Sequence, residues 1–113
     1  MSSLRMTLTM QMVLRSFLED PAKPRYGLEL CESAGLQSGT VYPILTRLEH
    51  VGWVDSTWED PEVHEAEGRP RRRYYTLSKD GLVEARQALA QISARQGKAI
   101  WARPQLRSEG GQG

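Results

Sequence analysis

The sequence contains one cysteine, Cys31, and two histidines, His50 and His64, among 113 residues. A single cysteine excludes an internal disulfide and any zinc site built from several thiolates. The histidines lie too far from other ligand-type residues for us to expect a metal site. The sequence also lacks a phosphate-binding glycine loop, an ordered Ser-His-Asp set and paired carboxylates in an apolar setting. We therefore assign no catalytic residue and expect no cofactor.

Long hydrophobic runs are also missing. No apolar segment approaches the roughly 20 residues that a membrane-spanning helix needs. Residues 6–18 contain Arg15 and several polar side chains, so they match neither a membrane span nor a signal peptide. A membrane-surface role is not expected either, because no basic amphipathic helix has a large apolar face. The length and composition predict one cytoplasmic domain.

The formal net charge is only +1, but the charges are unevenly distributed. Residues 1–53 hold five basic and five acidic side chains, whereas residues 54–68 hold six acidic side chains and no lysine or arginine. Residues 69–113 then hold ten basic and three acidic side chains. A phosphate-binding surface is a local property, so the low total does not exclude nucleic acid.

Hydrophobic periodicity and turn residues predict the order helix, helix, helix, strand, loop, strand, helix. The expected ranges are residues 4–19, 25–34, 38–50 with Ser38 as N-cap, 53–59, 60–70, 73–77, and 79 to 96 or 101. This order predicts a mainly α fold with a small β-hairpin, namely a winged helix-turn-helix with an added C-terminal helix. We assign residues 1–80 to the DNA-binding domain, 81–102 to a dimerisation helix and 103–113 to a disordered tail.

The third predicted helix has an apolar face formed by Val41, Ile44, Leu45 and Leu48. A helix fits the major groove when its exposed face carries small and hydrogen-bonding side chains near the N-terminus. An ordinary amphipathic helix with a solvated polar face would have the same pattern. On the DNA-binding interpretation, the contacting residues are Gln37, Ser38, Gly39, Thr40, Tyr42, Pro43, Thr46 and Arg47.

The second basic feature is the cluster Arg69, Arg71, Arg72 and Arg73, four arginines in five positions. Such a cluster is often only a solvated charge run, and here the acidic side chains of residues 54–68 are close enough in sequence to pair with it. We expect the acidic residues to lie at the tip of the wing. The arginines are then expected at its base, facing DNA.

Several motifs together resemble the PadR family of bacterial transcription regulators. They are Tyr26-Gly27, residues 39–49 (GTVYPILTRLE), residues 52–54 (GWV), residues 72–78 (RRYYTLS) and Gly81. The resemblance covers roughly residues 6–92 and is specific, because the blocks occur in the right order and spacing. This chain is similar to the short subfamily with one C-terminal helix. Its wing is longer and more acidic than the family pattern, and Gly97 and Pro104 shorten the last helix.

The resemblance implies a homodimer that binds double-stranded DNA at a pseudo-palindromic operator, usually as a repressor. The first and last helices would form the dimer interface, through Leu8, Met12, Leu82, Ala85, Leu89 and Ile92. Some family members respond to small aromatic molecules held between the subunits. The corresponding effector-binding residues here would be Met10, Phe17 and Trp101, although methionine and aromatic side chains at helical spacing are more often simple packing.

Two other classes of function remain open. A winged-helix protein-interaction module without DNA binding would use the acidic wing as its docking surface. An enzyme would use Cys31 or His50, but no base lies near Cys31 in the sequence.

Overall fold

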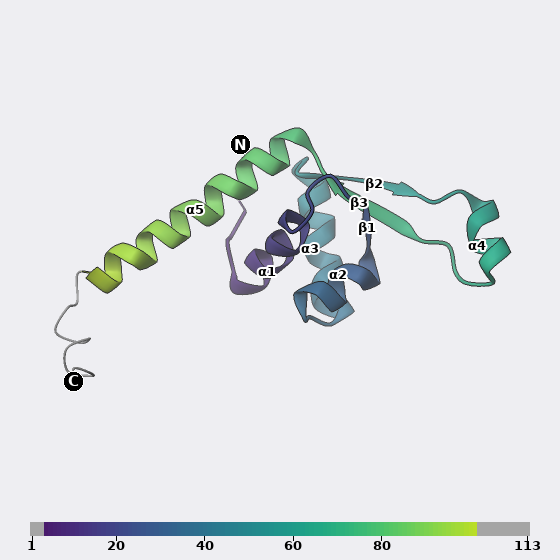
Figure 1. The fold of residues 1–113 in the computed structure, drawn as a ribbon, viewed down its shortest axis with the longest axis horizontal. Helices are drawn as coiled ribbons and strands as arrows, with labels where there is room; N and C mark the ends of the chain where they lie inside the picture. The colour runs from purple at the N-terminus through teal and green to yellow at the C-terminus, as the bar shows by residue number, and fades with distance from the viewer. Residues whose placement is uncertain (1–3, 102–113) are drawn as a thin grey trace.

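The computed structural model describes residues 4–101 and the side chains of residues 4–97, and these residues form five helices and three strands (Figure 1). They are α1 (Leu8–Leu18), β1 (Arg25–Tyr26), α2 (Gly27–Ala34), α3 (Ser38–His50), β2 (Val54–Trp58), α4 (Pro61–Glu67), β3 (Arg73–Leu77) and α5 (Lys79–Trp101). The predicted winged helix-turn-helix with an added C-terminal helix is confirmed.

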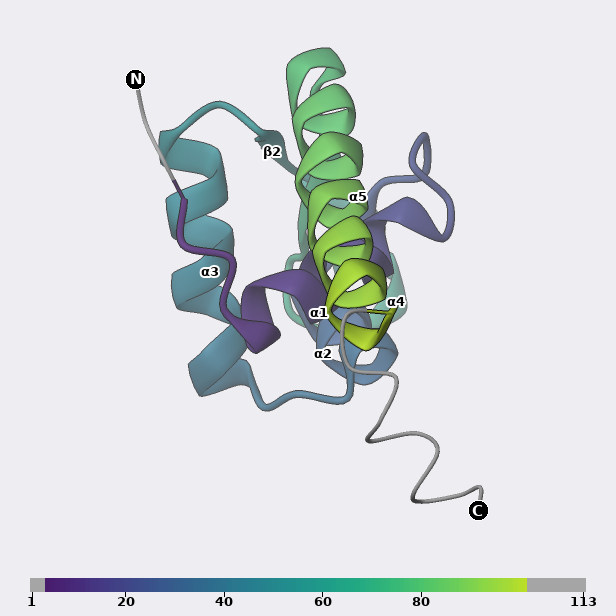
Figure 2. The same ribbon diagram turned by 90° about the vertical axis from the view of Figure 1, so that its left-hand side faces the viewer.

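The core lies where α1 contacts α2, α3 and the start of α5. Figure 2 shows α5 passing in front of α1, with α3 standing beside them. The core side chains of α1 and α2 include Val13, Leu14, Phe17 and Leu30, and α3 buries its predicted apolar face, Val41, Ile44, Leu45 and Leu48. Burial of such aliphatic and aromatic side chains is the main favourable term in folding.

Two predicted helix starts were wrong. The first helix begins at Leu8 rather than residue 4, because the Thr7 hydroxyl accepts a hydrogen bond from the Met10 backbone N–H at 3.2 Å and so caps the helix. The third helix has Gln37, not Ser38, as its N-cap. The extended Gln37 uses its backbone carbonyl to accept from Thr40 N–H at 2.9 Å, so the Ser38 hydroxyl is not needed for capping.

The sheet has a third strand that was not predicted. Arg25 and Tyr26 pair antiparallel with Tyr75 and Tyr74 of β3, which gives the order β1-β3-β2. These two residues were expected to open the second helix, but that helix begins at Gly27. Arg25 is buried, and its Nη1 donates to the Ser16 carbonyl at 2.9 Å. This non-local contact holds residues 25–26 in the sheet rather than the helix.

The wing is the β2–β3 hairpin, in register from Val54 opposite Leu77 to Trp58 opposite Arg73. Its connection was predicted as a polar loop, but most of it is the short helix α4. Asp60 caps this helix by accepting from Glu62 N–H at 3.0 Å, and Gly68 ends it at a φ of 65°. In Figure 1 the wing projects away from the helices and α4 lies at its tip.

The last helix starts as predicted from Ser78, whose Oγ accepts from Gly81 N–H at 2.9 Å. Its first turns pack against the body through the buried Ala85 and the half-buried Leu82 and Leu89. Beyond them α5 runs away from the other elements (Figure 1). Within residues 4–101, no helix combines the length and apolarity needed to cross a bilayer.

Candidate nucleic-acid interface

The outer face of α3 is exposed along its whole length. Its underside is fixed in the core by Val41, Ile44, Leu45 and Leu48, each at most 1% exposed. The opposite face is formed by the residues that the sequence placed there. Thr40 is half-buried, and the exposed residues of this face are Gln37, Ser38, Gly39, Tyr42, Pro43, Thr46 and Arg47. The predicted polar face therefore exists as one surface.

Tyr42 is held in position by a close approach of α2. A β-carbon at position 27 would overlap the phenol ring of Tyr42, so Gly27 allows the ring to lie directly against the α2 backbone. Partial burial, and then the neighbouring Cys31, raise the pKa of the Tyr42 hydroxyl. The hydroxyl is therefore protonated at neutral pH and can donate a hydrogen bond to an anion.

Two of the four wing arginines are neutralised by carboxylates. Arg69 forms two hydrogen bonds with Glu59, at 2.6 and 3.0 Å, and one with Glu67 at 2.8 Å. Arg73 contacts Glu49 at 3.2 Å and donates to the Ser56 hydroxyl at 2.8 Å. The expected separation of acidic tip and basic base is thus incomplete, because Arg69 is paired with Glu59, which precedes α4, and with Glu67, the last residue of α4.

The other two arginines pack on aromatic rings. The Arg72 guanidinium lies 3.9 Å from the centre of the Tyr26 ring, and that of Arg71 lies 5.5 Å from Trp58. The salt bridges of the described residues include neither Arg71 nor Arg72. Neither positive charge is therefore compensated by an ion pair. Each guanidinium is oriented by the aromatic ring on which it packs.

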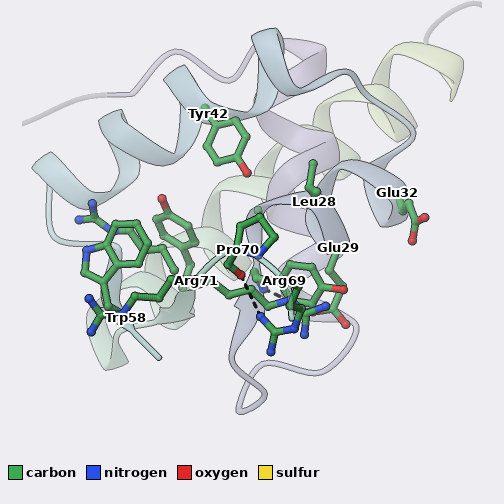
Figure 3. A pocket seen from close by; sticks show the side chains of 13 residues that line it. Leu28, Glu29, Glu32, Tyr42, Trp58, Arg69, Pro70 and Arg71 are labelled. Carbon is green, nitrogen blue, oxygen red and sulfur yellow. Dashed lines mark hydrogen bonds between the residues drawn. The ribbon is translucent and has the colours of Figure 1, made fainter. Parts of the chain in front are cut away.

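These features meet in a groove of about 690 Å³ between α2, α3 and the wing. Figure 3 shows Tyr42 reaching from α3 toward Pro70 and Arg71, with Leu28 on one side and Trp58 on the other. The fold therefore brings together the two stretches that the sequence singled out.

Sequence reasoning missed several residues that line the groove, namely Tyr26, Leu28, Trp58 and Tyr75. Trp58 is 51% exposed, and the guanidinium groups of Arg71 and Arg73 lie over its ring. The signal in the sequence that could have identified Trp58 was its place at the outer end of β2, next to a run of arginines.

The expected dimer-interface residues differ in exposure. Leu8 is 67% exposed, while Met12, Leu82, Leu89 and Ile92 are half-buried. Ala85 is 0% exposed within the protomer, so the protomer's own core already covers this side chain. It was assigned to the interface because it lies on the same helical stripe as Leu82 and Leu89. Periodicity alone cannot tell which residues of such a stripe face the protomer's own core and which face a partner subunit.

The expected effector-binding residues do not line an open space in the protomer. Met10 and Phe17 are 2% and 1% exposed and belong to the hydrophobic core. Their assignment as effector-binding residues is therefore corrected, because these methionine and aromatic side chains pack inside the protein's own core. The side chain of Trp101 lies outside the described residues.

The candidate residues for an enzyme are unremarkable in the structure. Burial raises the pKa of the half-buried Cys31 thiol, which lowers the fraction of reactive thiolate. In the part of the chain that the structure describes, no three His, Cys, Asp or Glu side chains are placed to hold a metal ion.

The Glu59 carboxylate is the centre of the hydrogen-bond network of the wing, so the stability of the protein depends on whether this group is ionised. Its pKa is lowered to about 2, first by the hydrogen bond from Arg69 and then by the Arg72 backbone N–H. Because the folded-state pKa is depressed, the stabilisation is present above the unfolded pKa, about 4.3, and is lost as pH falls toward 2.

We expect Glu59→Gln to lower the melting temperature at pH 7 and to flatten its fall between pH 4.5 and 2. Melting curves followed by circular dichroism would measure both effects. Glu65→Gln, an exposed α4 residue without an ion pair, removes the same charge and serves as the control. Equal melting of the two variants at pH 7 would contradict this role of Glu59.

Comparisons with known proteins agree on one class. No curated protein matched the chain, but 41 chains of solved structures did. A PadR family transcriptional regulator from Eggerthella lenta DSM 2243 is 27% identical, with a TM-score of 0.61 over 82% of this chain and 85% of that one. A PadR family regulator from Clostridium difficile R20291 is 21% identical, with a TM-score of 0.65 over 83% and 95%.

A Streptococcus transcriptional regulator is 23% identical, with a TM-score of 0.65 over 88% of this chain and 99% of that one. These structures share the fold, and they are regulators rather than enzymes. The model of the Transcriptional regulator PadR-like family matches residues 16–87, more than half of the chain. With its winged-helix fold and its exposed α3 beside the arginines of the wing, the protein belongs to the PadR-like family of transcriptional regulators.

Proposed function

We propose that this regulator represses transcription by binding a pseudo-palindromic operator in duplex DNA as a homodimer. The observation that carries the proposal is the juxtaposition of the exposed α3 face with Arg71 and Arg72, neither of which forms a salt bridge among the described residues. A regulator acting on DNA in this way would work in the cytoplasm.

In this proposal α3 enters the major groove and the wing contacts the sugar-phosphate backbone. Small residues near the start of α3, such as Ser38 and Gly39, allow close approach, and Arg47 reaches a base edge or a phosphate. Tyr42, Arg71 and Arg72 bind phosphates. Arg69 and Arg73 contribute less than the sequence suggested, because each is already paired with a carboxylate.

The proposed dimer uses α5 together with α1. Leu8 and Val83 are large apolar side chains at 67% and 53% exposure, and a partner helix would cover them. We keep residues 1–80 as the DNA-binding unit and α5 as the dimerisation helix. Two copies would then read half-sites about one helical turn apart.

A small-molecule effector is also part of the proposal. PcaV from Streptomyces coelicolor was solved with its natural ligand, and DNA binding by BpsR from Bordetella bronchiseptica is regulated by 6-hydroxynicotinic acid. These proteins share the fold of this chain at 20% and 15% identity. The bound ligand of PcaV and the regulation of BpsR support a comparable response here.

Substitutions on the two surfaces should have different effects on DNA binding. Arg47→Ala and Tyr42→Ala are expected to weaken operator binding by about 1–3 kcal/mol, because Arg47 loses its contact to a base edge or a phosphate and Tyr42 loses its contact to a phosphate. Arg72→Ala should weaken all duplexes about equally and reduce the salt slope of log K by about 1. Gel-shift or anisotropy titrations at several salt concentrations measure these values.

Arg86→Ala, which removes an exposed charge on α5, is the control and should leave phosphate contacts unchanged. The proposal fails if the wild-type protein flows through heparin and random duplex at low salt. That result would favour the protein-interaction module, for which the acidic α4 would be the docking surface.

A further inference from the structure

Arg69 is the wing arginine whose donors the protein itself occupies most fully. A guanidinium has five N–H donors, and Arg69 makes four hydrogen bonds with them. Two go to Glu59 at 2.6 and 3.0 Å, one to Glu67 at 2.8 Å and one to the Pro70 carbonyl at 3.1 Å (Figure 3). The side chains of Arg69 and Glu59 are only 19% and 8% exposed. A phosphate can therefore bind this guanidinium through two N–H groups only after a carboxylate has left it.

Arg69 nevertheless lies beside the arginines that are assigned to DNA phosphates. It lines the same groove as Arg71 and Arg72. Glu59 connects all three, because its carboxylate also accepts from the Arg72 backbone N–H at 2.8 Å and its carbonyl accepts from Arg71 Nε at 2.9 Å. The contact that occupies Arg69 is thus built into the stretch that presents the two arginines without a salt bridge.

The carboxylates hold Arg69 as a DNA phosphate would hold it. Arginine binds carboxylates and phosphates in the same way, with two parallel N–H groups donating to two anionic oxygens. Glu59 and Glu67 therefore compete with DNA for one binding group. Exchange of a carboxylate for a phosphate would also leave unpaired negative charge next to the DNA backbone, where like charges repel.

We propose that Glu59 and Glu67 limit the affinity of the protein for DNA by keeping Arg69 from the phosphates. This inference rests on the proposed DNA-binding function. Phosphate contacts carry no sequence information, so an occupied Arg69 lowers the affinity for every duplex alike. Stable occupancy is then left to sites at which α3 adds base contacts.

The test is the salt dependence of binding to a labelled random duplex, measured by anisotropy. In Glu59→Gln an NH2 group replaces one carboxylate oxygen, so the two-oxygen contact with Arg69 is lost, while the remaining oxygen can still accept from Arg72 N–H. With Arg69 free to bind a phosphate, the slope of log K against log salt should steepen by about 0.9. At about 0.1 M salt this corresponds to binding that is about eightfold tighter.

Glu67→Gln provides a second variant that disturbs the fold less. The Glu67 side chain is 56% exposed and makes one of the four bonds to Arg69. Its replacement should steepen the slope in the same direction by a smaller amount, which tests the proposal even if Glu59→Gln unfolds. Circular dichroism at the assay temperature checks that each variant is folded.

Two controls separate the release of Arg69 from a simple change of net charge. Glu65→Gln removes the same charge from an exposed α4 position outside the ion pairs of the described residues and should leave the slope unchanged. The double variant Glu59→Gln/Arg69→Gln should return to the wild-type slope, because no guanidinium is released. Equal slopes for Glu59→Gln and Glu65→Gln, or a steepening that persists in the double variant, would overturn the proposal.

The same titrations distinguish this inference from the proposed function. If the wild-type protein binds the duplex and neither Glu59→Gln nor Glu67→Gln steepens the slope, the inference fails and the proposed function stands. If the wild-type protein does not bind at low salt, the proposed function fails. Binding by Glu59→Gln that disappears in the double variant would then still support the role of the two carboxylates, whereas no binding by any variant overturns both.

Discussion

Replacing Phe17 with alanine is expected to destabilise the protein by about 3–5 kcal/mol. Phe17 is 1% exposed and is the largest of the fully buried side chains, so the substitution leaves a cavity among α1, α2 and α3. This loss is a large part of the free energy of unfolding of a domain of this kind, which is roughly 5–15 kcal/mol. Urea unfolding followed by circular dichroism measures it.

The same experiment separates the two interpretations of Phe17. A residue lining an open effector site would contribute little to folding, and its replacement would mainly change ligand response. Val63→Ala, on the exposed side of α4, is the control and should cost less than about 0.5 kcal/mol. An equally small loss for Phe17→Ala would show that the core assignment is wrong.

The second large effect is expected at Gly81, where α5 begins. A β-carbon at this position would overlap the backbone carbonyl of Trp53. That carbonyl already accepts from Ser78 N–H at 2.9 Å and from the Ser78 hydroxyl at 3.2 Å, so the backbone cannot move without breaking these bonds. We expect Gly81→Ala to destabilise the protein by about 1–3 kcal/mol or more, as overpacking of a rigid site does.

Gly97 provides a matched control in the same helix. Apart from its chain neighbours and the backbone of its own helix, no described atom lies within 4 Å of the place where its β-carbon would be built. Gly97→Ala should therefore stabilise the protein by about 0.5–1 kcal/mol through helix propensity. In thermal unfolding, a lower melting temperature for Gly81→Ala and a higher one for Gly97→Ala would support the close contact at Gly81. Shifts of the melting temperature in the same direction would contradict it.

Local signals in the sequence were sufficient for α1, α2, α3, α5 and the hairpin. The spacing of Val41, Leu45 and Leu48 fixes which face of α3 is buried, because a helix repeats every 3.6 residues. Capping signals also lay in the sequence at α4, where Asp60-Pro61 precedes and Gly68 follows the helix. The prediction of a loop there was wrong because the segment has no apolar face on which periodicity could act.

Non-local contacts could not be predicted in this way. Strand β1 has only two residues and is defined by its partners in β3, which lie far along the chain. Likewise, the arginine cluster gave no indication of which members are paired. Arg73 meets Glu49, 24 positions earlier, and Arg69 meets Glu59 across α4.

The sequence by itself determined the family, the winged-helix order of elements and the exposed polar face of α3, because these depend on motifs and periodicities within single segments. The tertiary structure decided that Phe17 and Met10 are core residues. It also decided that Arg71 and Arg72, rather than Arg69 and Arg73, keep unpaired charge beside Tyr42. Burial and ion pairing are set by residues distant in sequence, and only the folded chain brings those residues together.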